Sequence, residues 1–127
     1  MEQARFIKPR GWRAKFRAAF RGAKRGVRGQ SSFFVHFFTA AAVVAAGAVL
    51  GLSRLEWALL LLAITIVLVA EMFNSALEWI ALAADSKHNP HLAEGLDIGS
   101  GAVLLASIGS TIVGLIVFGQ RLIFLLG

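Results

Sequence analysis

The sequence predicts an all-α membrane protein in which an N-terminal amphipathic surface helix precedes three transmembrane helices. Three observations predict this class: 57% of the residues are hydrophobic, three long apolar segments fill the later part of the chain, and the basic residues gather at its beginning. Soluble domains contain roughly 45–50% apolar residues. The 127 residues suffice for one small domain, and the absence of cysteine excludes disulfides and thiolate sites.

The surface helix is expected within residues 1–29, which carry most of the positive charge. On a helical wheel Trp12, Phe16 and Phe20 share one face, and basic residues occupy the neighbouring sector. This pattern is typical of a helix on an anionic membrane surface, although an acid-poor transit peptide has a similar composition. Because the segment runs straight into apolar sequence, we expect no nucleic-acid partner. Ten of the 13 basic residues lie here: Arg5, Lys8, Arg10, Arg13, Lys15, Arg17, Arg21, Lys24, Arg25 and Arg28.

The transmembrane region is expected over residues 30–127, with spans at about 33–52, 55–82 and 98–119. Each span has about 20 residues or more, enough to cross a hydrocarbon core of about 30 Å. Ser53-Arg54 alone separates the first two spans, so they form a tight hairpin, whereas a polar stretch separates the second from the third. The positive-inside rule predicts a cytoplasmic N-terminus.

Two glutamates in the second span mark the most informative part of the sequence. Glu71, Asn74, Ser75 and Glu78 fall within one stripe about 100° wide on a helix. If Trp57 marks the outer interface, Glu71 lies about 21 Å deeper, a few ångströms beneath the cytoplasmic boundary, with Glu78 at the boundary. Carboxylates at membrane depth are costly, so they are functional candidates.

The depth of this stripe suits a reaction between a lipid alcohol from the bilayer and a soluble phosphate donor. A carboxylate below the surface can accept the proton of a hydroxyl group, and a second one at the surface can hold Mg²⁺. The spacing leaves two other interpretations open, a proton path for transport and structural contacts between helices.

The stripe also resembles a known signature. The stretch Glu71-Met-Phe-Asn-Ser-Ala-Leu-Glu78 is similar to E-x-x-N-[ST]-A-[IL]-E of the prokaryotic diacylglycerol kinase and undecaprenol kinase family. Further similarities occur at residues 16–22, at Phe33 and His36, and at residues 52–57 and 97–104, so that the resemblance covers roughly residues 14–119. His36 and the turn at 52–57 resemble the undecaprenol kinase branch.

The resemblance implies a homotrimeric lipid kinase of the bacterial inner membrane that uses ATP and Mg²⁺ in phospholipid metabolism. By residue, it assigns Glu71 and Asn74 to catalysis, Glu78 to the metal, and Asp97, Gln30 and Ser75 to cofactor binding. The alternatives are a family-shaped protein whose nucleotide chemistry is lost or altered and that acts as a binding or structural subunit, and a small proton-linked transporter.

The sequence departs from the family pattern at three positions. Gln30 stands where a metal-binding glutamate is usual, Leu82 where an aspartate is usual, and Leu96 where a lysine is usual. Replacements are available in principle: Asp85 for the aspartate, and Lys24, Arg28 or Lys87 for the phosphate partner. Asp97 also has the pattern of an N-cap for the third span, where free backbone N–H groups can hold phosphate.

Overall fold

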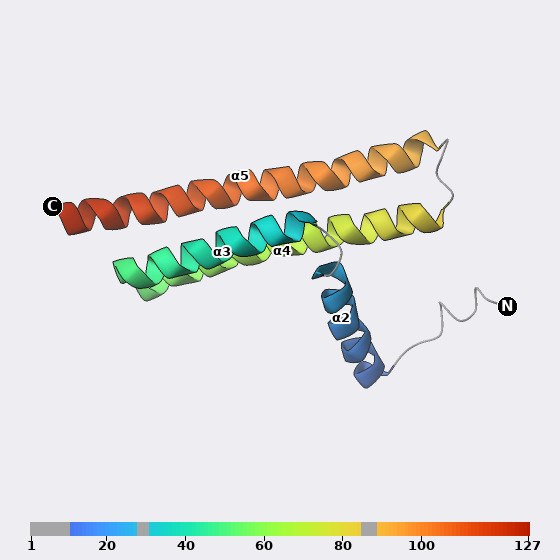
Figure 1. Ribbon diagram of the computed structural model, residues 1–127, viewed down its shortest axis with the longest axis horizontal. Coiled ribbons are helices and arrows are strands. Elements are labelled where there is room, and N and C mark those ends of the chain that lie inside the picture. The colour runs from blue at the N-terminus through green and yellow to red at the C-terminus, as the bar shows by residue number, and fades with distance from the viewer. Residues whose placement is uncertain (1–10, 28–30, 85–88) are drawn as a thin grey trace.

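The computed structural model describes residues 11–27, 31–84 and 89–127, and these residues contain helices and no strands. The helices are α2 (Trp12–Val27), α3 (Ser31–Leu50), α4 (Arg54–Ala83) and α5 (Pro90–Leu126). The three long helices α3, α4 and α5 lie side by side, and α2 leaves them at a steep angle (Figure 1). The most extensive packing joins α4 to α5, and α2 contacts α4.

Helices α3, α4 and α5 are long and apolar enough to cross a membrane, which confirms the prediction of three candidate spans. At about 1.5 Å per residue, the 30 residues of α4 extend about 45 Å and the 37 of α5 about 55 Å. Both exceed a hydrocarbon core of about 30 Å. The end of α4 and the start of α5 extend beyond the level at which α2 meets α4 (Figure 1).

The predicted tight hairpin between the first two spans is confirmed by a short capped turn. Gly51 has a φ of +65°, a conformation that glycine adopts without steric cost, and it lets the chain reverse after α3. Ser53 is the N-cap of α4: its Oγ accepts from the backbone N–H of Glu56 at 3.2 Å, and Glu56 Oε1 accepts from the N–H of Ser53 at 3.0 Å. This reciprocal capping box begins α4 sharply.

A hydrophobic cluster and one arginine hold this end of the bundle together. Leu52, Leu60 and Val117 are buried against one another, so they join the turn to α4 and α5. Arg121 Nε donates to the carbonyl of Leu50 at 3.0 Å, and its Nη2 donates to the carbonyl of Gly51. Because the last carbonyls of a helix have no intrahelical partner, Arg121 caps α3 from a position far along the chain.

The third span begins and ends elsewhere than the sequence predicts. Helix α5 starts at Pro90 and continues to Leu126, so the prediction that Asp97 caps it is wrong. The N-cap is Asn89, whose side chain accepts from the N–H of His91 at 3.0 Å, and Pro90 occupies the first helical turn, where its missing N–H costs nothing. Residues 90–97, which look like part of a polar loop in the sequence, are helical and mostly exposed.

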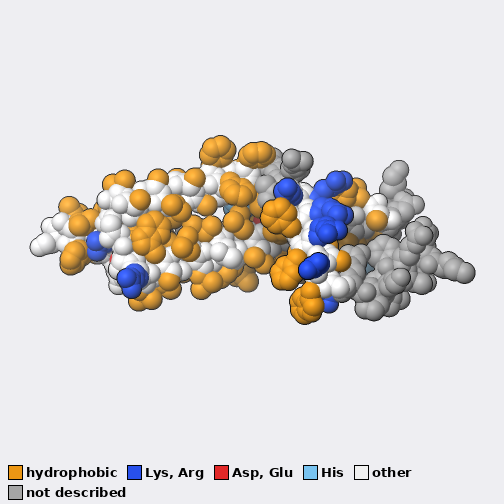
Figure 2. Space-filling view, turned by 90° about the horizontal axis from the view of Figure 1, so that it is seen from below, with side chains coloured by type: hydrophobic (Ala, Val, Ile, Leu, Met, Phe, Trp, Pro, Cys, Tyr) orange, Lys and Arg blue, Asp and Glu red, His pale blue; other side chains and the backbone are white. Residues whose placement is uncertain are grey.

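Helix α2 carries basic side chains and large aromatic side chains. Trp12, Phe16 and Phe20 are all exposed. Lysines and arginines form a blue band over α2 with orange side chains beside it, whereas the visible surface of the long helices carries few charges (Figure 2). Arg25 lies over the ring of Trp79, 5.5 Å from its centroid, and links α2 to α4.

Candidate functional site

The polar stripe predicted from the sequence lies on the buried face of α4. Glu71 is 2% exposed, Asn74 9% and Ser75 1%. Glu78, two turns after Glu71, is half-buried. The stripe ends there, because Leu82, one turn further, is 77% exposed. The 3.6-residue period of an α-helix places these four polar side chains on one face.

Two contacts involve side chains of the stripe, one within α4 and one from α3. Asn74 Nδ2 donates to Glu78 Oε1 at 3.3 Å, which joins two of the predicted site residues along α4. Nε2 of His36, on α3, lies 3.3 Å from Oε2 of Glu71. The carboxylate of Glu71 on α4 is therefore contacted by a side chain of a neighbouring helix, α3.

Helix α5 reaches the stripe through a glycine. A Cβ atom on Gly99 would lie 2.7 Å from Asn74 Oδ1 and 2.8 Å from Leu77 Cδ1. Real Cβ atoms do not approach other atoms this closely, so the present position of the Asn74 amide depends on the absence of a side chain at residue 99. A small residue at a helix contact lets two backbones approach closely.

Two buried polar atoms of the stripe have no hydrogen-bond partner among the described residues: Asn74 Oδ1 and Ser75 Oγ. Leaving such a group unpaired costs about 1–3 kcal/mol, so buried polar atoms are normally satisfied. These two oxygen atoms are therefore places where a substrate, a metal ion or another subunit can supply the missing contact.

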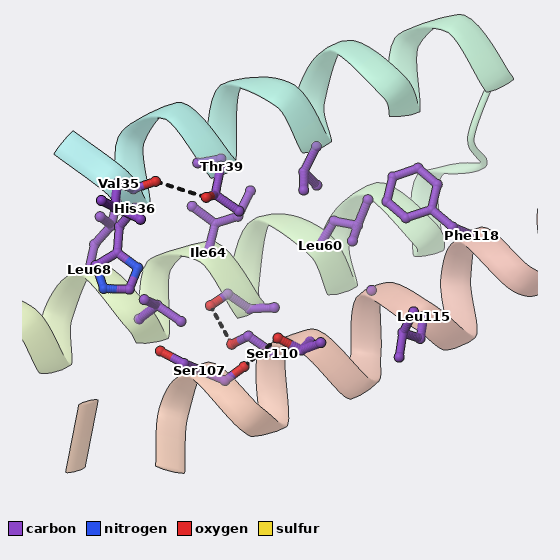
Figure 3. Close-up of a pocket in the computed structure, with 16 residues that line it drawn as sticks. Val35, His36, Thr39, Leu60, Ile64, Leu68, Ser107, Ser110, Leu115 and Phe118 are labelled. Atoms are coloured by element: carbon purple, nitrogen blue, oxygen red, sulfur yellow. Dashed lines mark hydrogen bonds between the residues drawn. The ribbon is translucent and has the colours of Figure 1, made fainter. Parts of the chain in front are cut away.

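A mostly apolar cavity of about 450 Å³ lies among α3, α4 and α5. His36 and Leu68 lie at one end and Leu115 and Phe118 at the other (Figure 3). Ser110 points in from α5 and donates to the carbonyl of Ala63 at 2.9 Å. Because His36 both lines the cavity and contacts Glu71, the cavity ends beside the carboxylate.

The structure does not bring every predicted residue to the stripe. Asp97 is exposed on α5 and lies about 200° around that helix from Gly99, so it points away from Asn74 within this chain. Lys24, a candidate phosphate partner, has its Nζ 5.1 Å from the ring centroid of Phe20. Four further candidates lie outside the described residues: Gln30, Arg28, Asp85 and Lys87.

The described residues contain no group of three or more His, Cys, Asp or Glu side chains that could hold a metal ion. Oxygen donors are nevertheless present on Glu78 and Asn74, whose side chains form a hydrogen bond with each other. Mg²⁺ is commonly bound by one or two carboxylates together with substrate phosphates and water. The stripe thus offers two neighbouring side chains with oxygen donors, Asn74 and Glu78.

The roles of His36 and Gly99 at the stripe are not evident from sequence patterns. His36 is the ionisable residue of an otherwise apolar span, and such a residue normally has a partner facing it, a signal that points to the residue but not to Glu71. Gly99 lies among several glycines and alanines, and only the packing of α5 on α4 distinguishes it.

Comparison with known proteins places this helical fold and its polar stripe in one family. The sequence profile described as prokaryotic diacylglycerol kinase matches residues 17–118. A diacylglycerol kinase from Synechocystis sp. is 36% identical over 100 residues, which are 78% of this chain and 57% of the relative. An undecaprenol kinase from Bacillus subtilis is 31% identical over 112 residues, which are 85% of this chain and 91% of the relative. No solved structure matches the chain significantly.

The chain therefore belongs to the prokaryotic diacylglycerol kinase family. This confirms the family predicted from the sequence motif and, at the level of the family, the prediction of a membrane lipid kinase. The names of the relatives do not favour the alternative of a structural subunit or a transporter.

Proposed function

We propose that the protein transfers the γ-phosphate of ATP to a membrane lipid alcohol, either diacylglycerol or undecaprenol, at the stripe on α4. One observation carries the proposal: a buried carboxylate, Glu71, lies on a helix long enough to span a bilayer, two turns before a second carboxylate, Glu78. This arrangement suits a reaction between one substrate in the membrane and another in water.

Glu71 acts as the general base in this proposal. Its carboxylate accepts the proton of the lipid hydroxyl as the alcohol oxygen attacks the γ-phosphorus, and the bond from that phosphorus to the bridging oxygen breaks to release ADP. Asn74, on the same face, contributes its amide to orienting the reacting groups, since its Nδ2 is already directed at Glu78. Positioning of this kind supplies much of the catalysis in phosphoryl transfer.

Glu78 is the proposed ligand of Mg²⁺, with Asn74 Oδ1 as a further oxygen donor. The donor set fits, because both atoms are hard oxygens and Asn74 Oδ1 is buried without a partner among the described residues. When bound, Mg²⁺ neutralises charge on the phosphates of the nucleotide. Ser75, Asp97 and Gln30 are proposed to face the nucleotide, Gln30 through an uncharged carbonyl.

We also propose that three copies of the chain form the working unit, with α2 on the cytoplasmic surface of a bacterial inner membrane. The unpaired Asn74 Oδ1 and Ser75 Oγ, and an Asp97 that turns away from its own stripe, are consistent with a site completed by a neighbouring subunit. The basic residues of α2 suit anionic inner-leaflet lipids. Residues 1–29 then form the surface element and residues 30–127 the kinase domain.

The test is phosphate transfer by purified protein in lipid, with labelled ATP, Mg²⁺ and either diacylglycerol or undecaprenol. We expect label in one lipid alcohol, and the preferred alcohol identifies the substrate. Failure to label either alcohol, with the protein folded and its oligomer intact, would overturn the proposal. ATP-independent, proton-coupled flux in liposomes would instead support a transporter.

The departure at residue 30 has its own test. Restoring a carboxylate with Gln30→Glu is expected to lower the Mg²⁺ concentration needed for half-maximal transfer, because a charged ligand binds a hard cation more strongly than a carbonyl does. An unchanged Mg²⁺ requirement would exclude residue 30 from the metal site.

A further inference from the structure

The contact between His36 and Glu71 joins two helices at the point where the proposed reaction occurs. Nε2 of the imidazole lies 3.3 Å from Oε2 of the carboxylate. The side chain of Glu71 is 3% exposed and that of His36 is 22% exposed. Of the two groups, the histidine is therefore the one that reaches the edge of the buried region, and its ring lines the cavity among the three spans (Figure 3).

The position of His36 is set by its own helix. Phe33, three residues earlier and on the same face of α3, is 2% exposed and anchors the start of this helix. Residues three apart in a helix are neighbours on one surface, so the burial of Phe33 turns His36 inward. One turn after His36, Thr39 donates to the carbonyl of Val35 at 2.8 Å, so this hydroxyl is directed at its own helix.

We propose that His36 is a positioning residue of the lipid kinase reaction, holding the carboxylate of Glu71 in the orientation in which it meets the lipid hydroxyl. The inference rests on the function proposed above. A glutamate has three side-chain torsions, and a carboxylate on an isolated helix samples several of them. A polar group on a second helix restricts that sampling, because the imidazole Nε2 lies 3.3 Å from Oε2 and favours the rotamers that keep this contact.

The role assigned to His36 is orientation and not proton transfer from the substrate. Its ring touches Glu71, and Glu71 is the group that takes the proton. Misplacing a catalytic group by about 1 Å can reduce a rate about 100-fold. Loss of His36 should therefore act on kcat and leave the affinity for ATP nearly unchanged, since His36 lies on the cavity side of Glu71.

The activity test compares three variants of the full chain in lipid. We expect His36→Leu to lower kcat by about 100-fold with a KM for ATP within about twofold of the unmodified protein. His36→Gln, whose amide nitrogen can occupy the place of Nε2, should recover at least about a tenth of the unmodified kcat. Thr39→Val is the matched control, with the same helix and the same cavity, and should change kcat less than about twofold. A full kcat in His36→Leu, or an equal loss in Thr39→Val, would overturn the proposal.

A second measurement does not depend on activity. In protein labelled with ¹⁵N-histidine, the ring nitrogen resonances of His36 are identified by their loss in His36→Gln, since the chain has three histidines. Glu71→Gln removes the charge beside Nε2 and should shift these resonances, whereas Glu94→Gln, at an exposed position on α5, should not. An unmoved His36 signal in Glu71→Gln would overturn the contact even if the lipid kinase activity is present. A shifted signal in a protein that phosphorylates no lipid would mean that only the proposed function had failed.

Discussion

The two ends of the helix bundle differ in how their polar groups are satisfied. At the end that holds the turn between α3 and α4, the polar groups named above are paired: Ser53 and Glu56 cap α4, and Arg121 caps α3. At the other end, the buried stripe holds two oxygens without partners among the described residues, on Asn74 and Ser75. The first end therefore stabilises the fold, whereas the second retains unpaired polar atoms that a bound molecule or another subunit can satisfy.

Changing Glu71 should produce the largest functional effect. Glu71→Gln keeps the size of the side chain and removes its ability to accept a proton, so we expect phosphate transfer to fall at least about 100-fold. The helical circular dichroism and the oligomer size should not change. Glu94→Gln is the control, because Glu94 is exposed on α5, and it should retain activity. Substantial transfer by Glu71→Gln would remove Glu71 as the base and leave the buried stripe without its proposed role.

A side chain at Gly99 should give the next largest loss of activity. Gly99→Leu places a side chain where a Cβ already lies 2.7 Å from Asn74 Oδ1, so the amide must move away from Glu78. We expect transfer to fall by about tenfold or more, with a raised Mg²⁺ requirement. Gly101→Leu is the matched control, since no atom lies within 4 Å of a Cβ there. Equal effects of the two substitutions would show that packing of α5 on the stripe does not position Asn74.

A cavity at the end that holds the turn between α3 and α4 should reduce stability and leave the rate of phosphate transfer unchanged. Leu60 is 2% exposed and joins α4 to the cluster with Leu52 and Val117. Leu60→Ala is expected to destabilise the fold by about 2 kcal/mol, because the lost packing leaves a void. Thermal unfolding in detergent measures the change, and Leu61→Ala, at a half-exposed position on the same helix, should have a smaller effect. A loss of kcat in the folded fraction of Leu60→Ala would contradict the assignment of stability to this end and of catalysis to the other.

Removing the Arg121 cap should also reduce stability, by less than Leu60→Ala does. Arg121→Gln removes charge-assisted hydrogen bonds to the carbonyls of Leu50 and Gly51, and we expect a cost of about 1–2 kcal/mol in the same unfolding measurement. Arg54→Gln, at an exposed position in the turn region, is the control and should change stability little. If the two variants unfold alike, the cap does not fasten α5 to the turn.

Much of the fold could be predicted from local sequence patterns. Long apolar runs with few charges predict helices of spanning length, and they identify the spans that became α3, α4 and α5. The boundaries of α5 were predicted less well, because the polar stretch before the span hid a start signal at Asn89-Pro90. The start of a helix depends on one or two capping residues, whereas a membrane span is recognised from the summed hydrophobicity of about twenty residues.

Local sequence is enough to establish that the protein is helical, that it has three candidate spans, and that four polar side chains share one face of α4: Glu71, Asn74, Ser75 and Glu78. These properties follow from composition and from the 3.6-residue period, which relate residues within one helix. Three contacts become visible only once the helices are packed: His36 faces Glu71, Gly99 lies against the amide of Asn74, and Arg121 caps α3. Such contacts depend on how each helix is rotated and tilted against its neighbours, and packing between helices sets these angles.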